Sequence, residues 1–231
     1  MSSAGASTSA TSYSACLKCE KPGTKRCTRC STQYCSDDCE ANDSNIHNIL
    51  CESMSDREDR PGAGFRRAVY FPVNESAPRF VWVPFNEEDW AMDNHYVRQN
   101  LFHDVEFFQY KTFDENPILK RRLGYSVFLW HDDEFKVNGQ PENQALQSVS
   151  KVDLSRHWRG PLLAVVVQVD EFGGVTDVQD ANPDVLSILA DIVHLKTGRV
   201  NTLTVFPFEI TQMGSREMAF FASLMGNLRR N

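Results

Sequence analysis

All seven cysteines of this 231-residue chain lie between Cys16 and Cys51, and the 180 residues that follow contain none. One histidine, His47, falls in the same stretch and completes four closely spaced pairs. The pairs are Cys16 with Cys19, Cys27 with Cys30, Cys35 with Cys39, and His47 with Cys51. Eight soft ligands within 36 residues indicate joint metal binding. We therefore expect two structural zinc ions, bound by these eight residues.

The spacing within the pairs suits zinc. Two residues separate the cysteines of the first two pairs, so both thiolates of a pair reach one ion in a tight turn. His47 and Cys51 are four residues apart, which places them on one face of a helical turn. Structural zinc takes four ligands, so eight residues serve two ions in either a sequential or an interleaved order.

Composition and charge narrow the class of protein. The net charge of −7 and the pI near 5.4 argue against nucleic-acid binding through the overall field of the protein. No apolar run approaches the roughly 20 residues that a membrane-spanning helix needs. Residues 1–15 consist mainly of Ser, Ala and Thr, so we expect a disordered tail there.

The same N-terminal stretch lacks the basic start and the apolar segment of a secretory signal peptide. We therefore expect an intracellular protein, in the nucleus or the cytoplasm. In those compartments cysteines stay reduced, so the cluster is interpreted as metal ligands and not as disulfides.

The complete ligand pattern resembles the MYND-type zinc finger. The gaps between successive ligands are two, seven, two, four, three, seven and three residues, with cysteine at six positions, then histidine, then cysteine. Two further features are similar to that family: Tyr34 and Ser36 flank Cys35, and Asp43 lies four residues after Cys39. The resemblance covers residues 16–51 only.

The resemblance implies an interleaved order of ligands. Cys16, Cys19, Cys35 and Cys39 would bind one ion, and Cys27, Cys30, His47 and Cys51 would bind the other. It also implies a protein-interaction adaptor or regulator, acting in transcriptional regulation or ubiquitin-ligase assembly. Its partner would be a protein bound through a short proline-containing peptide motif, which adds to the finger as an extended strand.

Two positions depart from the peptide-binding members of that family. Glu40 stands where many have glutamine after the sixth cysteine, and Ser44 stands where they have tryptophan. The expected groove therefore loses a large wall and gains a charge. We expect Tyr34 and Ile46 to supply a smaller apolar surface in its place.

Basic residues gather among the first ligands. Seven thiolates and two zinc ions leave a formal excess of about −3. We expect the basic side chains to offset that charge and to donate hydrogen bonds to sulfur. They are Lys18, Lys21, Lys25, Arg26 and Arg29.

The predicted fold class is a small two-zinc MYND-type finger followed by an α+β globular domain. A charged and then Pro- and Gly-containing stretch, residues 52–64, indicates a linker before the domain at 65–231. Apolar runs at 68–73 and 80–85 predict a hairpin, because turn-forming residues separate them. Residues 123–130 predict another strand, and the aliphatic run 162–169 is typical of a central strand.

One helix of this domain is well marked. Asn182 is expected as its N-cap, Pro183 in its first turn and Gly198 after its end, with Val185, Ile188, Leu189, Ile192 and Val193 on one face. A further strand at 203–208 and an apolar helix face between Met218 and Leu228 complete the predicted domain.

The second hypothesis places an enzyme in residues 65–231, with the finger as its docking module. We do not expect a SET methyltransferase, because only 15 residues precede Cys16 and the later cysteines that bind a third zinc in such enzymes are absent. The densest polar group in the domain is the run His131, Asp132, Asp133 and Glu134. Consecutive residues point in different directions, so we expect this run to be a structural turn and the chain not to be an enzyme.

Overall fold

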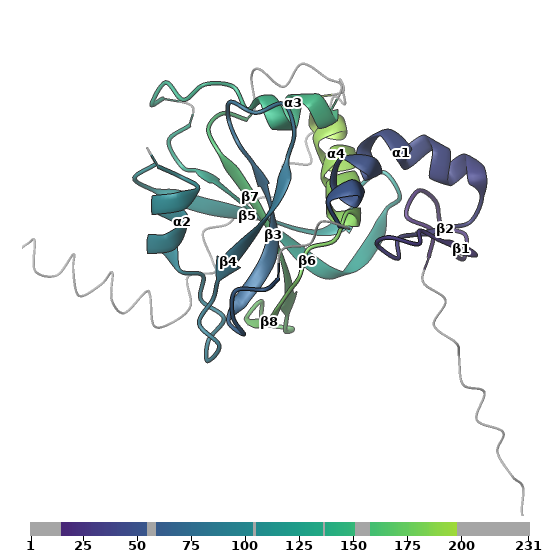
Figure 1. Cartoon of the computed structure of the whole chain (residues 1–231), viewed down its shortest axis with the longest axis horizontal. Coiled ribbons are helices and arrows are strands. Elements are labelled where there is room, and N and C mark those ends of the chain that lie inside the picture. Colours follow the sequence, from purple (N-terminus) through teal and green to yellow (C-terminus); the bar gives the residue numbers. More distant parts are fainter. Residues whose placement is uncertain (1–14, 55–58, 104, 136, 151–157, 198–231) are drawn as a thin grey trace, which may run out of the picture. The chain divides into compact units, whose positions relative to one another are not determined.

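The structure, a computed structural model, describes residues 15–54, 59–103, 105–135, 137–150 and 158–197, which are coloured in Figure 1. They belong to one compact unit. The predicted tail at 1–14, the strand at 203–208 and the helix between Met218 and Leu228 lie outside the described residues. None of the described helices is long and apolar enough to cross a bilayer.

Strand β7 (Leu162–Val169) is the centre of a six-stranded antiparallel sheet, in the order β4-β3-β7-β6-β5, with β8 also paired to β7. Its alternate residues enter two different apolar clusters. Leu162, Ala164 and Val166 enter one, and Leu163, Val165 and Val167 enter the other. Burial on both faces explains why the strand is a nearly continuous aliphatic run, as predicted.

The predicted hairpin is confirmed as β3 (Phe65–Phe71) and β4 (Arg79–Pro84), which pair antiparallel. The strand predicted at 123–130 is β6, which is longer (Arg121–Asp132). Its partner β5 (Phe108–Asn116) and the short β8 (Val175–Gln179) were not predicted from the sequence. Gly173, at a φ of 83°, lies in the turn between β7 and β8.

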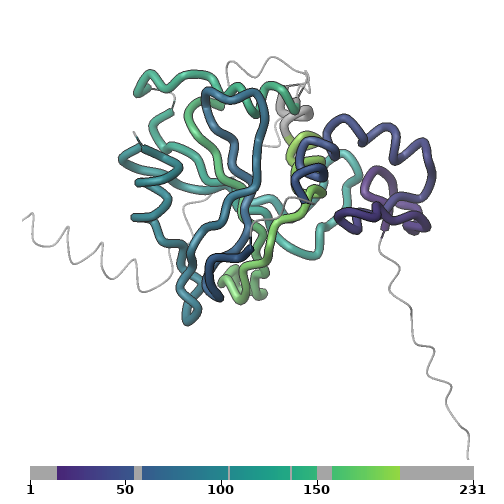
Figure 2. The backbone as a smooth tube through the Cα atoms, in the orientation of Figure 1, coloured from purple at the N-terminus to yellow at the C-terminus, as the bar shows by residue number. Residues whose placement is uncertain are grey.

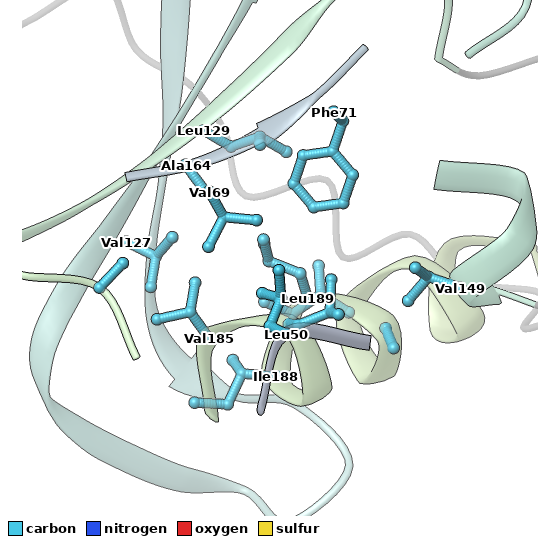
Figure 3. Packing of buried hydrophobic residues seen from close by; sticks show 14 of the residues in the cluster. Leu50, Val69, Phe71, Val127, Leu129, Val149, Ala164, Val185, Ile188 and Leu189 are labelled. Atoms are coloured by element: carbon cyan, nitrogen blue, oxygen red, sulfur yellow. The ribbon is translucent and has the colours of Figure 1, made fainter. Parts of the chain in front are cut away.

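Helix α4 (Asp184–Thr197) is the helix that the capping signals predicted. The Asn182 side chain accepts a hydrogen bond from the backbone N–H of Asp184 at 3.0 Å. Val185, Ile188, Leu189 and Ile192 are buried against one face of the sheet. Figure 3 shows Val185 and Leu189 among the side chains of Val69, Val127 and Leu129.

Two seven-residue helices complete the sheet's surroundings. Helix α3 (Gln144–Ser150) contributes Leu146 and Val149 to the α4 side of the sheet, and α2 (Asn94–Asn100) contributes Val97 to the opposite side. The result is a mixed helix and sheet domain.

The cysteine-rich segment begins with a small hairpin, β1 (Lys25–Arg26) and β2 (Gln33–Tyr34). It continues into α1 (Asp37–Cys51), whose N-cap Ser36 accepts a hydrogen bond from the Cys39 backbone N–H. A 3₁₀ turn, η1 (Glu52–Met54), follows. Figure 2 traces this path from the N-terminal hairpin into α1.

The cysteine-rich segment shares its apolar core with the sheet. Cys16, Leu17, Tyr34 and Leu50 are buried in the same cluster as the α4 residues. Figure 3 shows Leu50 of α1 next to Leu189 of α4. Beyond η1, Arg60 pairs with Asp180 at 2.7 Å, so the part of the predicted linker that the structure describes also contacts the domain.

Candidate metal centre

The first cluster of metal-ligating side chains joins Cys16 and Cys19 to Cys35 and Cys39. Cys16 and Cys19 lie in a turn closed by a hydrogen bond from the Cys16 N–H to the Lys21 carbonyl at 2.9 Å. Cys35 precedes α1 and Cys39 is in its first turn. The Cys19 Sγ lies 3.3 Å from Cys35 Sγ and 3.9 Å from Cys39 Sγ.

The second cluster joins Cys27 and Cys30 to His47 and Cys51. Cys27 and Cys30 lie in the loop between β1 and β2, where Ser31 has a φ of 68°. His47 and Cys51 are in the C-terminal half of α1, one turn apart as predicted. Cys27 Sγ lies 3.6 Å from Cys51 Sγ, and Cys30 Sγ lies 3.5 Å from His47 Nε2.

Both clusters fit a zinc ion. A Zn–S bond of about 2.3 Å gives an S–S edge of about 3.8 Å in a tetrahedron. The sulfur atoms of Cys19, Cys35 and Cys39 in the first cluster lie 3.3 to 3.9 Å apart. All ligand atoms of either cluster lie within 4.8 Å of one another. The structure therefore assembles the eight residues in the interleaved order, as four cysteines and as three cysteines with one histidine.

The thiols of Cys51 and Cys39 have raised pKa values, whereas hydrogen bonds to the Cys27 sulfur outweigh its burial and lower its pKa to about 6. Burial raises the pKa of Cys51, and the neighbouring Cys27 and Cys30 side chains raise it further, to about 12. The Ser36 hydroxyl lowers the pKa of Cys39, but the thiols around it outweigh this effect and raise it to about 12. Adjacent thiolates repel one another, so joint ionisation requires a positive ion among them.

Comparison with known families agrees with this geometry. The family model described as MYND finger matches residues 16–51. Residues 16–51 are a MYND finger. Neither the curated proteins nor the solved structures compared with the chain gave a match. The finger, a zinc-binding protein-interaction module, is therefore the part of the chain that the comparisons characterise.

Asp43 is the buried centre of the MYND finger. It lies on α1 between the ligands Cys39 and His47 and has no exposed surface. Its two carboxylate oxygens accept hydrogen bonds of 2.7 Å, one from the Tyr34 hydroxyl and one from the Ser187 hydroxyl of α4. The Tyr34 phenol has a raised pKa, first because it is buried and second because it donates to Asp43. Sequence reasoning noted Asp43 only as a family feature and did not find these partners.

Helix α4 presents a polar stripe to the finger, formed by Asp184, Ser187 and Asp191. These residues are three and four apart, so they share one helix face. Asp184 accepts a hydrogen bond from the Thr32 hydroxyl, which also lies 3.1 Å from Cys30 Sγ. Burial raises the pKa of Asp184, and the Thr32 hydrogen bond opposes that rise. The Thr32 hydroxyl therefore links Asp184 of this stripe to Cys30 of the second cluster.

The first cluster is attached to the sheet domain at two points. Asp191 of the α4 stripe accepts a hydrogen bond from Lys18 at 3.1 Å. The guanidinium of Arg121, at the start of β6, donates to the carbonyl oxygens of Cys16 and Cys19 at 3.0 and 3.2 Å. Outer contacts of this kind orient metal ligands. The domain thus supports both clusters.

The basic residues of the finger include two with carboxylate partners. Lys18 contacts Asp191 and Asp43, and Lys25 contacts Asp37 and Glu40. Sequence reasoning expected these lysines to donate to sulfur. The two lysines instead pair with nearby carboxylates, one of which belongs to helix α4.

The polar face of the finger is formed by Lys25, Asp37, Glu40 and Ser44. Glu40 pairs with Lys25 at 3.3 Å, with 47% and 43% of their side chains exposed. The Ser44 hydroxyl donates to the Ala41 carbonyl. The two positions that depart from the family pattern therefore lie on a hydrophilic, accessible surface.

The prediction that Tyr34 forms part of an apolar binding surface is wrong. Tyr34 is 1% exposed, because it packs in the core shared with α4 and its hydroxyl is bound to Asp43. Ile46 is half-buried and packs against the same core. Tyr34 therefore does not replace the family's aromatic wall, while Ile46 is partly exposed.

The run His131, Asp132, Asp133 and Glu134 has structural contacts. The His131 ring is buried between Phe135 and Trp158, and its burial lowers its pKa. Asp132 accepts hydrogen bonds from the Glu134 backbone N–H and from the Asn138 amide. The predicted turn is confirmed for Asp133 and Glu134 only, because His131 and Asp132 are buried residues at the end of β6.

Proposed function

We propose that the chain is a zinc-dependent protein-interaction adaptor whose MYND finger contacts a partner protein through its polar face. The family match supports the class of function, since MYND fingers are protein-interaction modules. The observation that supports the choice of surface is the burial of Tyr34 and Asp43 beneath α4. Contact with the domain takes up that side of the finger.

The polar face favours a partner with complementary charge. Lys25, Asp37 and Glu40 place both signs of charge within one accessible surface. Exposed charges at the rim of an interface act mainly on specificity and association rate. A proline-containing peptide motif remains part of the proposal, with its contacts altered at Glu40 and Ser44. We propose transcriptional regulation or ubiquitin-ligase assembly as the process that the chain serves, and this proposal comes from the resemblance alone. The resemblance is also the basis for proposing a binding role and not a catalytic one.

Charge reversal on the polar face tests the proposal. The full chain, loaded with zinc, serves as bait for affinity capture as wild type, as Glu40→Lys and as Arg122→Glu. Arg122 is the matched control, because its side chain is 87% exposed and belongs to β6, outside the finger. We expect a directly binding protein that the wild type and Arg122→Glu retain and Glu40→Lys loses. Identical partners for all three proteins, each containing two zinc ions, would contradict the proposal.

A further inference from the structure

A second surface with the properties of a binding site follows the edge of the sheet. β4 is the outermost strand next to β3 in the described sheet. A cavity of about 560 Å³ runs beside it and is lined by Phe80, Val81 and Trp82 of the strand. Tyr96 of α2, Ser53 and Pro61 also line this cavity. We call this cavity the β4 groove.

The register of the hairpin shows which backbone groups face the groove. The Phe85 N–H donates to the Gly64 carbonyl, so this facing pair is hydrogen-bonded. In an antiparallel ladder such pairs alternate with pairs whose N–H and C=O groups point outward. Two residues further on, Val83 and Val81 therefore point their backbone groups toward β3. Trp82 and Phe80 point theirs toward the groove.

The accessible stretch of this edge is short. Pro84 has no N–H, and its carbonyl already accepts a hydrogen bond from the Asp93 N–H at 3.0 Å. Pro78 precedes the strand at the other end. Proline limits strand pairing at sheet edges. The outward backbone groups between the two prolines match a partner strand of a few residues.

The charge of the lining selects the partner. Arg67 and Arg79 line the groove, and no acidic residue is among the described residues that line it. The guanidinium of Arg67 lies 4.8 Å from the Phe80 ring centre, and that of Arg60 lies 5.5 Å from the Trp82 ring centre. Arg60 already pairs with Asp180 at 2.7 Å, so Arg67 and Arg79 are the cations of the lining that favour a partner carboxylate.

A second cavity extends the groove. It measures about 370 Å³ and shares Arg79, Asn100 and Leu101 with the first. Arg79 therefore stands where the two cavities meet. Its side chain is 51% exposed, and its guanidinium lies over the Tyr70 ring at 5.2 Å. Its Nε also lies 3.7 Å from the carboxylate of Glu75, which is 54% exposed and lines the second cavity. Exposed ion pairs of this kind contribute little stability, so a carboxylate of a partner can replace Glu75.

We propose that the β4 groove binds an extended, acidic segment of a partner protein, which adds to the sheet as a strand. The outward backbone groups of Phe80 and Trp82 pair with the segment, and Arg79 contacts one of its carboxylates. Main-chain hydrogen bonds supply affinity in such complexes, and side-chain pockets supply specificity. This site is separate from the polar face of the finger and does not depend on the function proposed above.

The test uses a fluorescent ten-residue peptide of alternating glutamate and valine and the full, zinc-loaded chain. Fluorescence anisotropy measures its binding beside two control peptides. One control replaces glutamate by lysine, and the other is N-methylated at alternate residues, which removes the backbone donors needed for strand addition. We expect binding of the first peptide and at least tenfold weaker binding of both controls. Equal binding of all three, or binding of none, would overturn the proposal.

Two variants locate the binding. Arg79→Glu reverses the charge where the cavities meet, and Arg122→Glu makes the same change on β6. We expect Arg79→Glu to weaken the acidic peptide at least tenfold and Arg122→Glu to leave it unchanged, with both variants folded by circular dichroism. Equal weakening by the two variants would overturn the proposal. So would sedimentation showing that a second copy of the chain occupies the edge and excludes the peptide.

Discussion

The α4-facing side of the MYND finger and its polar face differ in almost every physical respect. On the α4-facing side, Asp43 and Thr32 are 0% and 2% exposed and bind partners from α4. On the polar face, Lys25 and Glu40 are nearly half exposed and bind each other. The first side acts as part of the domain core. The second side is exposed, and it is the side that we propose for contact with a partner.

This difference separates stability from recognition within 36 residues. Buried polar groups are costly to leave without partners, so changes on the α4-facing side should alter folding. Exposed ion pairs contribute little to stability, so changes on the polar face should alter binding alone. The following predictions test that separation.

Zinc removal should have the largest effect. Structural zinc contributes on the order of 10 kcal/mol in isolated fingers. Because Cys16, Leu17 and Leu50 share a core with α4, chelation should unfold the finger and also expose α4. Hydrogen exchange followed by mass spectrometry should show lost protection in residues 16–51 and in 184–192. Strand β4 and helix α2, whose Val83 and Val97 belong to the other apolar cluster, serve as the internal reference. Unchanged exchange in α4 would show that the finger is independent of the domain.

Asp43→Ala should have the second largest effect. It leaves the Tyr34 and Ser187 hydroxyls buried without their acceptor. The expected loss is about 3 kcal/mol of unfolding free energy, at roughly 1–3 kcal/mol for each unsatisfied group. Denaturant unfolding of zinc-loaded protein measures it. The control is Asn45→Ala, at an exposed position of the same helix, and similar losses in both variants would remove the special role of Asp43.

A double-mutant cycle between Asp43 and Ser187 should give a smaller effect. Ser187→Ala removes one donor and leaves Asp43 bound to Tyr34. We expect a loss of about 1 kcal/mol in wild-type protein and a clearly smaller loss in the Asp43→Ala background, which has no acceptor for the Ser187 hydroxyl. Additive losses in the cycle would mean that the finger and α4 are not coupled through this hydrogen bond.

The smallest effect on stability should come from the pair Glu40→Gln and Ser44→Trp. Both positions lie on the polar face, so the unfolding free energy should change by no more than about 0.5 kcal/mol. The pair restores the glutamine and the tryptophan of the family pattern. Titration of a proline-rich peptide, followed by amide chemical shifts, should therefore show stronger binding than in the wild type. If the double variant unfolds, Glu40 and Ser44 are needed for the stability of the finger, which would contradict the prediction.

The sequence was sufficient wherever the determining residues are close together. The cysteine gaps predicted the ligands, the aliphatic run at 162–169 predicted β7, and Asn182 predicted the start of α4. It was insufficient where contacts join distant segments. Ser187 is 144 residues from Asp43, and neither residue indicates the other by type or spacing.

Contacts between distant segments also explain which sequence predictions were wrong or missing. Tyr34 looked like a surface aromatic because the helix that covers it comes about 150 residues later. Strand β5 was not predicted because it forms the far edge of the sheet, and most of its residues are exposed and polar. Helices α2 and α3, at seven residues each, are too short for a clear apolar period.

Helix α1 carries Cys39 of the first cluster and His47 and Cys51 of the second, at intervals of four and eight residues along one face. A single rigid element thus holds ligands of both ions. Filling either site orders the helix that the other needs, so the two occupancies are thermodynamically linked and loading should be cooperative. Under zinc limitation, the chains should divide into fully loaded and empty molecules, with few carrying one ion.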